Sequence, residues 1–93
     1  MSEPKKLGPG DDLEMMRSFD NWPVWPTLPM KRYVDGQLEP AILVELITSY
    51  QYAFVPGVTM YDKVKASDPR IERFSKDNIE RLQAILADGW MVD

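Results

Sequence analysis

Two pairs of carboxylates have a spacing that could support general acid–base chemistry: Asp68 with Glu72, and Asp77 with Glu80. The same spacing is typical of helix caps and of surface ion pairs with neighbouring arginines and lysines. The sequence has neither histidine nor cysteine, which excludes an imidazole base and a thiolate nucleophile. It also has no glycine-rich phosphate loop and no nucleophile elbow. We therefore predict a protein that is not an enzyme and that holds no cofactor or metal.

A proline-rich segment, Trp22 to Met30, concentrates apolar side chains that could contact a partner. A large apolar residue precedes each of its three prolines. Proline fixes its own φ and pushes the preceding residue toward extended geometry, which predicts a polyproline II strand with three residues per turn. One edge of that strand would hold Trp22, Trp25 and Leu28, and another would hold Val24, Thr27 and Met30.

Two interpretations of this segment stay open. Residues 25–31 have the hydrophobic-Pro-x-hydrophobic-Pro-x-basic order of a polyproline ligand for an SH3-like domain. Alternatively, the tryptophan edge packs across the protein's own sheet, because a tryptophan buries on the order of 150–250 Å² and two exposed ones favour aggregation. We favour internal packing, which leaves the other edge and its basic continuation for a partner. The predicted partner-binding residues are Val24, Thr27, Met30, Lys31, Arg32 and Asp20.

The formal net charge of −4 argues against nonspecific nucleic-acid binding, which needs a concentrated basic surface. Lys31 and Arg32, together with Lys63 and Lys65, could form a small basic patch beside aromatic residues, but an ordinary solvated rim is the simpler interpretation. Residues 11–20 are acidic and could recognise a basic partner, although helix capping accounts for the two aspartates at their start. We therefore expect a protein partner and no nucleic acid.

The chain of 93 residues has the length of one domain. Residues 1–10 contain little apolar surface and are predicted to form a flexible arm, and residues 11–93 are predicted to form a single α+β domain. The first residues do not have the pattern of a secretory signal, and no apolar run approaches the roughly 20 residues of a membrane helix. We predict a soluble, cytoplasmic protein that does not bind membranes.

Within this domain we expect a short N-terminal helix over residues 11–17, followed by the polyproline segment crossing a small antiparallel sheet. Asp35-Gly36 fits a two-residue hairpin turn, because both positions of such a turn need positive φ. Pro40 cannot donate to a ladder, so it predicts that pairing of the return strand is short or at an edge.

Residues 41–54 are the hardest segment to assign. Alternating β-branched and aromatic residues favour two strands around a turn at Thr48-Ser49, while a helix opened by Pro40 is the alternative. A second turn at Pro56-Gly57 would lead into residues 58–61 as the continuation of a small antiparallel meander.

The last third of the chain predicts helical structure. Asp68-Pro69 has the form of an N-cap followed by proline at the first helical position, in a turn that ends near Phe74. Ser75 would then cap a longer helix, and Gly89 would end it in a left-handed conformation. Residues 90–92 are mostly large and apolar, which predicts that the chain end returns to the core. The apolar stripe of this C-terminal helix would comprise Ile79, Leu82, Ile85 and Leu86.

Two motifs resemble small uncharacterised proteins encoded in phage and bacterial genomes. They are Trp22-Pro23-x-Trp25-Pro26-x-Leu28-Pro29-x-Lys31-Arg32 and the terminal Ala87-Asp88-Gly89-Trp90-x-Val92-Asp93. The resemblance leaves the middle of the chain unmatched. It implies a context alone: a small accessory protein, viral in origin, that acts in a bacterial cytoplasm.

From these observations we predict a non-enzymatic accessory protein that binds and modulates a host bacterial protein of unknown identity. The alternatives are a virion or assembly component, a nucleic-acid-associated protein and a polyproline ligand of an SH3-like domain. An open sheet edge would also allow a homo-oligomer.

Overall fold

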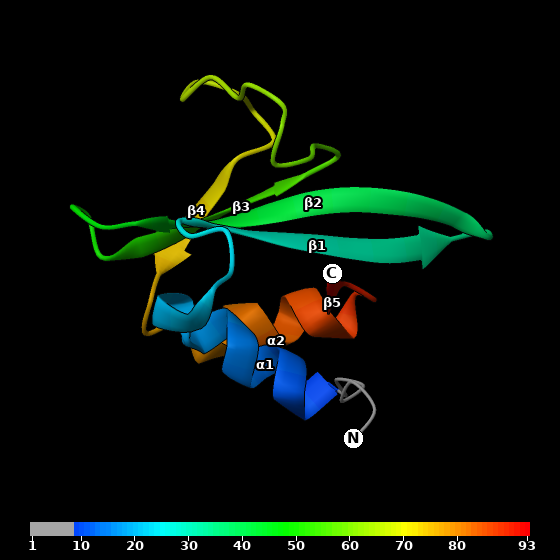
Figure 1. Ribbon diagram of the computed structural model, residues 1–93, viewed down its shortest axis with the longest axis horizontal. Coiled ribbons are helices and arrows are strands. Elements are labelled where there is room, and N and C mark those ends of the chain that lie inside the picture. Colours follow the sequence, from blue (N-terminus) through cyan, green and yellow to red (C-terminus); the bar gives the residue numbers. More distant parts are fainter. Residues whose placement is uncertain (1–8) are drawn as a thin grey trace.

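The computed structural model describes residues 9–93 and has the α+β fold that the sequence predicts. Five strands form one antiparallel sheet in the order β4-β3-β2-β1-β5. Figure 1 shows α1 and α2 side by side on one face of this sheet and the long β3–β4 connection on the other. The elements are α1 (Pro9–Arg17), the short 3₁₀ helix η1 (Phe19–Asn21), β1 (Thr27–Val34), β2 (Gln37–Leu46), β3 (Gln51–Pro56), β4 (Glu72–Ser75), α2 (Ile79–Ala87) and β5 (Met91–Val92).

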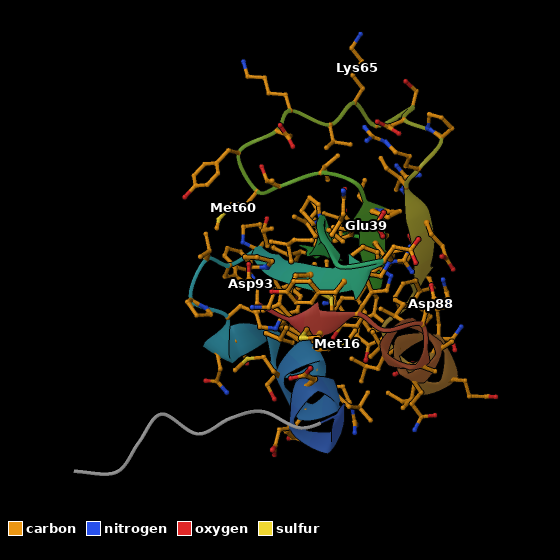
Figure 2. The ribbon with its side chains drawn as sticks, turned by 90° about the vertical axis from the view of Figure 1, so that its right-hand side faces the viewer. Met16, Glu39, Met60, Lys65, Asp88 and Asp93 are labelled. Carbon is orange, nitrogen blue, oxygen red and sulfur yellow. The ribbon has the colours of Figure 1, made fainter. Side chains whose placement is uncertain are left out.

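The helix-covered face of the sheet carries the main core. Leu28 and Met30 of β1 both point to this face, because residues two apart in a strand share a side, and they lie opposite Leu43 and Ala41 of β2. Figure 2 shows Met16 of α1 between the helices and the sheet. The buried residues of this core are Met16, Trp22, Leu28, Met30, Ala41, Leu43, Tyr52, Phe54, Phe74, Leu82, Ile85 and Trp90.

The opposite face carries a smaller core closed by residues 57–71. Ile42 and Val55 are neighbours across β2 and β3, and Val58 packs on them. The prediction that residues 58–61 continue the meander is wrong, since they form no strand. The backbone N–H of Thr59 donates to the Asp62 carboxylate at 2.7 Å, and the N–H of Asp62 donates back to the Thr59 carbonyl. This stretch therefore closes a turn instead of pairing with a strand.

The β1–β2 hairpin turns at Asp35-Gly36, as predicted, and both residues have positive φ, 51° and 79°. The prediction of short or edge pairing holds at Pro40 itself, which pairs with β1 but lies outside the β2–β3 ladder. It is wrong for β2 as a whole, which has ten residues and lies between β1 and β3. The Pro40 carbonyl accepts from the Gly57 N–H at 2.8 Å, just past the end of β3. The missing N–H of Pro40 therefore falls beyond the last pair of the β2–β3 ladder.

Residues 41–54 are strands joined by a turn, which confirms the strand interpretation over the helical one. The β2–β3 pairing runs from Ala41 opposite Pro56 to Leu46 opposite Gln51. Thr48-Ser49 lie in the connecting turn, as predicted.

The segment before α2 differs from its prediction. The Asp68 carboxylate caps no helix; it accepts from the backbone N–H of Arg70 at 2.9 Å and from its guanidinium, and the chain continues into β4. The cap of α2 is Asn78 rather than Ser75, because the Asn78 side chain accepts from the Arg81 N–H at 3.0 Å. Three residues separate the end of β4 from the start of α2.

The chain end returns to the core, as predicted. Gly89 follows α2 with a φ of 97°, the left-handed conformation that ends many helices. Trp90 is buried, and β5 pairs with β1 through Val92 opposite Met30. The Asp12 carboxylate of α1 accepts from the Val92 N–H at 3.2 Å and so ties the last strand to the first helix.

The proline-rich segment is only partly the strand that the sequence predicts. Trp22 and Leu28 are buried, but Trp25 is 48% exposed, so the prediction of one fully buried edge is wrong at Trp25. The chain turns there: the Thr27 N–H donates to the Val24 carbonyl at 3.0 Å around the cis Trp25–Pro26 peptide bond. From Thr27 onward the segment is β1, where side-chain direction repeats every two residues instead of three.

α1 begins at Pro9, two residues before the predicted helix. Pro9 and Gly10, assigned to the flexible arm, are therefore helical, in keeping with the preference of proline for the first helical turn. The rest of the predicted arm, residues 1–8, lies outside the described residues. Between residues 9 and 93, no helix has both the length and the apolar character that crossing a membrane requires.

Candidate functional site

The predicted partner-binding residues do not gather on one surface. Asp20 is exposed on η1, Val24 is exposed before β1, and Thr27 is half-buried where β1 begins. Met30 is buried, so the prediction that it contacts a partner is wrong. The reason is that Met30 lies two residues after Leu28 in a strand and shares its core-facing side.

Lys31 and Arg32 point to opposite faces of the sheet, as successive residues of a strand do. Lys31 pairs with Asp93 at 3.2 Å. Arg32 pairs with Glu39 at 2.7 Å and with Asp88 at 2.9 Å. Each of these two cations is therefore already neutralised by an acidic neighbour within the protein.

The four basic residues considered as a patch are not brought together either. The Arg32 guanidinium stacks on Trp90, 4.5 Å from the ring centroid, on the helix-covered side of the sheet. Lys65 lies at the outer edge of the connection on the other side, as Figure 2 shows. The structure thus supplies no continuous basic surface from these residues.

The first candidate pair for acid–base chemistry is held in ion pairs with arginines. A side-chain hydrogen bond from Arg70 lowers the pKa of Asp68 to about 2. A side-chain hydrogen bond from Arg81 likewise lowers the pKa of Glu72. Asp68 lies in a loop and Glu72 on β4, so they do not share a helix face. In the described range, no cluster of three or more acidic residues is placed to hold a metal ion.

A site that the sequence did not indicate lies at the end of the sheet opposite the β1–β2 hairpin turn, on the left in Figure 1. Glu45, near the end of β2, forms an ion pair with Lys76, which directly follows β4. The Lys76 and Glu45 side chains are only 7% and 5% exposed. The other Glu45 oxygen accepts from the Trp25 indole N–H at 2.5 Å. Buried charges are tolerated when their remaining atoms have partners, and both oxygens of this carboxylate do.

Aromatic rings surround the same ion pair. The Lys76 ammonium lies 4.3 Å from the ring centroid of Phe19 and 5.2 Å from that of Tyr50, within the range of cation–π attraction. Tyr50 has a φ of 53°, which ends the β2–β3 turn, and its backbone carbonyl accepts from the Lys76 N–H at 3.1 Å. We call Phe19, Trp25, Glu45, Tyr50 and Lys76 the ion-pair cluster.

A cleft of about 220 Å³ lies beside the ion-pair cluster, and we call it the tyrosine cleft. Its walls come from three parts of the chain: the end of α1 with η1, the β2–β3 turn with β3, and the segment that leads into α2. The residues that line it are Arg17, Phe19, Tyr50, Tyr52, Lys76, Asp77 and Ile79.

Tyr52 is the buried polar residue of this cleft, at 2% exposure. Its ring stacks on Trp22 and packs against Phe74, with centroids 6.1 and 5.8 Å away. Its hydroxyl has no hydrogen-bond partner among residues 9–93. Burial is the largest cause that raises the pKa of Tyr52 to about 12; the charges of Glu45 and Tyr50 raise it further, while the charge of Arg17 acts in the opposite direction. At neutral pH this hydroxyl is therefore an un-ionised donor to which residues 9–93 supply no acceptor.

Other hollows also lie on the described surface. One, of about 300 Å³, runs between α2 and Trp90, and its arginine, Arg81, is held by Glu72. Another, of about 250 Å³, is an apolar groove that includes Met15 and Val24, and a third, of about 220 Å³, lies along α1 and η1. By contrast, Arg17 of the tyrosine cleft forms no ion pair within residues 9–93, so this cleft retains a donor that the protein itself does not use.

Comparisons with family models, with curated proteins and with solved structures gave no match.

The sequence contains one signal for the ion-pair cluster. In a strand, Glu45 must point to the same side as Leu43 and Ala41, which places a carboxylate among apolar residues. A buried carboxylate needs a cation or donors, but Lys76 and Trp25 lie 31 and 20 residues away in sequence. No local spacing connects them, so the partners could not be predicted without the fold.

Proposed function

We propose that the chain is a non-enzymatic, protein-binding protein whose partner contacts the ion-pair cluster and the tyrosine cleft. The observation that carries this proposal is the half-exposed Trp25, which is fixed by its hydrogen bond to the buried Glu45. Tryptophan and tyrosine are among the most frequent energetic anchors of protein interfaces. A side chain that is already held in place also loses less conformational freedom when a partner binds.

The size and charge of the site support a protein partner over other ligands. Pockets for small molecules and cofactors usually enclose roughly 300–1,000 Å³, whereas the tyrosine cleft encloses about 220 Å³. A single residue of a partner suits that volume better than a cofactor does. Asp77 at the cleft, Asp20 on η1 and the net charge of −4 oppose a nucleic-acid backbone.

Besides Trp25, an exposed pair of apolar side chains lies at the other end of the molecule. Tyr33 and Leu38 are direct neighbours across the β1–β2 hairpin and are 61% and 58% exposed. Neither side chain forms a hydrogen bond or ring contact with another part of the described chain. Unlike Trp25, this pair is not fixed by a buried polar group, so we place the partner at the Trp25 end.

The broader context stays a prediction. The role as a phage accessory protein that modulates a host protein in a bacterial cytoplasm rests on the sequence resemblance, and a virion component or a nucleic-acid-associated protein remain its alternatives. We do not retain the polyproline-ligand alternative. Such a ligand needs residues 25–31 as a free strand, whereas Thr27–Val34 form β1 and Met30 is buried.

The test compares quantitative capture of bacterial proteins by the wild-type chain, by Trp25→Ala and by Tyr33→Ala. Both substitutions remove an exposed aromatic side chain, and circular dichroism would establish that both variants are folded. We expect a defined set of proteins to be lost with Trp25→Ala and kept with Tyr33→Ala. If the two variants capture the same proteins as the wild type, or if only Tyr33→Ala loses them, the proposed site is wrong.

A further inference from the structure

We propose that the tyrosine cleft binds the C-terminal residue of the partner protein, a residue that presents a free carboxylate together with an apolar side chain. This inference rests on the proposed function and specifies which part of the partner enters the cleft.

Residues with hydrogen-bond donors line the cleft from three parts of the chain. The Tyr52 hydroxyl of β3 lacks an acceptor within residues 9–93, and Arg17 of α1 lacks an ion pair there. The ammonium of Lys76 has three N–H donors, and its charge is shared with Glu45. A carboxylate offers acceptors only, and hydrogen bonds to a charged acceptor are about twice as strong as neutral ones. A carboxylate therefore suits a cleft that is lined by these donors.

Apart from Asp77, the remaining residues that line the cleft carry apolar surface. Phe19 and Tyr50 contribute ring surfaces and Ile79 contributes an aliphatic one. The last residue of a protein carries its carboxylate and its side chain on the same Cα, so both can enter one cleft. The side chain of aspartate or glutamate instead presents its carboxylate at the tip, with only methylene groups behind it. The combination of donors and apolar walls therefore favours a chain terminus.

The charges around the cleft limit the ligand to about one negative charge. Lys76 is offset by Glu45, and Arg17 shares the cleft with Asp77. Asp77 also accepts from the Tyr50 hydroxyl at 3.1 Å, which holds this negative charge at the rim. A doubly charged phosphate would meet more repulsion here than a monoanionic carboxylate would.

The experiment is a titration of the ¹⁵N-labelled protein with short peptides, followed by the chemical shifts of backbone amides. The probes are N-acetyl-Ala-Leu with a free carboxylate, the same dipeptide as its C-terminal amide, N-acetyl-Ala-Glu amide, and inorganic phosphate. We expect millimolar binding of the free acid alone, with the largest shifts at Tyr50, Lys76 and Asp77.

Variants then test the assigned donors. Tyr52→Phe keeps the ring packing and removes the hydroxyl, and Arg17→Gln changes an exposed side chain that no ion pair holds. We expect each to weaken binding of the free acid about tenfold, since each removes a hydrogen bond to a charged group. Arg73→Gln is the matched control, because Arg73 is an exposed arginine of β4 that does not line the cleft. The affinity of Arg73→Gln for the free acid should equal that of the wild type.

Four results would overturn the inference: no binding of the free acid, equal binding of the amide, equal binding of the glutamate side chain, or preferential binding of phosphate. Capture of the partner separates this inference from the proposed function. If Trp25→Ala loses the partner while Arg17→Gln and Tyr52→Phe keep it, the proposed site stands and the carboxylate assignment fails. If all three keep the partner, the proposed site fails as well.

Discussion

The buried ion pair between Glu45 and Lys76 gives the sharpest prediction about stability. Lys76→Met leaves the Glu45 carboxylate 5% exposed with the Trp25 indole N–H as its remaining partner. Removing one member of a buried pair typically costs about 3–5 kcal/mol. A domain of this size has a total stability of roughly 5–14 kcal/mol, so the loss is a large fraction of the whole. We expect the melting temperature to fall by more than about 10 °C.

The double variant Glu45→Leu/Lys76→Met separates the cost of an unpaired charge from the loss of the pair. Replacing a buried ion pair by apolar residues of similar volume is often neutral or stabilising. We therefore expect the double variant to recover to within about 1 kcal/mol of the wild type, or to exceed it. Urea denaturation of the wild type, of Lys76→Met, of Glu45→Leu and of the double variant, followed by circular dichroism, measures the coupling between the two positions.

Lys31→Met is the control for this cycle, because Lys31 forms a half-exposed ion pair with Asp93. Exposed pairs contribute about 0–1 kcal/mol. A loss for Lys76→Met no larger than the loss for Lys31→Met would refute the reasoning. So would a double variant that is less stable than both single variants, since the unpaired charge would then not be the source of the loss.

Three further predictions follow from other parts of the fold. Truncation after Gly89 removes β5 and the buried Trp90, and should destabilise the domain by at least about 3–5 kcal/mol, the usual cost of emptying a tryptophan site; an unchanged melting temperature would contradict it. Trp25 is the exposed member of the three tryptophans, so Trp25→Phe should remove the acrylamide-quenchable part of the fluorescence, and quenching that persists would show another accessible indole. Burial raises the pKa of Asp12 above 3.8 in the folded protein. The folded state therefore binds this proton more tightly than the unfolded state does, and the resulting contribution to stability is lost as pH rises through the raised pKa. Asp12→Asn should therefore stabilise the protein most at neutral pH and progressively less as pH falls toward about 4, as urea denaturation at several pH values would reveal.

The parts of the fold that the sequence predicted are those set by local chemistry. Asp35-Gly36 accept positive φ at both positions of a hairpin turn, and Gly89 accepts it after a helix. The return of Trp90 to the core follows from the need to bury a large apolar residue. The two turns depend on a few adjacent residues, and the burial of Trp90 depends on the character of its own side chain, so none of these predictions required knowledge of the contact partners.

The features of the fold and of the candidate site that the sequence did not predict depend on contacts between distant residues. Met30 is buried because β1 imposes a period of two on a segment whose prolines suggest a period of three. Trp25 is exposed because the chain turns before β1 begins, where the Thr27 N–H donates to the Val24 carbonyl. Asp68-Pro69 has the local form of a helix start, but the carboxylate binds Arg70 and the chain joins the sheet. The tyrosine cleft combines residues from α1 to α2, so no spacing in the sequence indicates it.

The most direct test of the proposed binding site is the contact between the bound peptide and the protein, measured as intermolecular nuclear Overhauser effects with N-acetyl-Ala-Leu. The leucine methyl groups should give cross-peaks to the rings of Phe19 and Tyr50, which form the apolar walls of the tyrosine cleft. Cross-peaks to Met15 and Val24 of the apolar groove, with none to the two rings, would contradict the account.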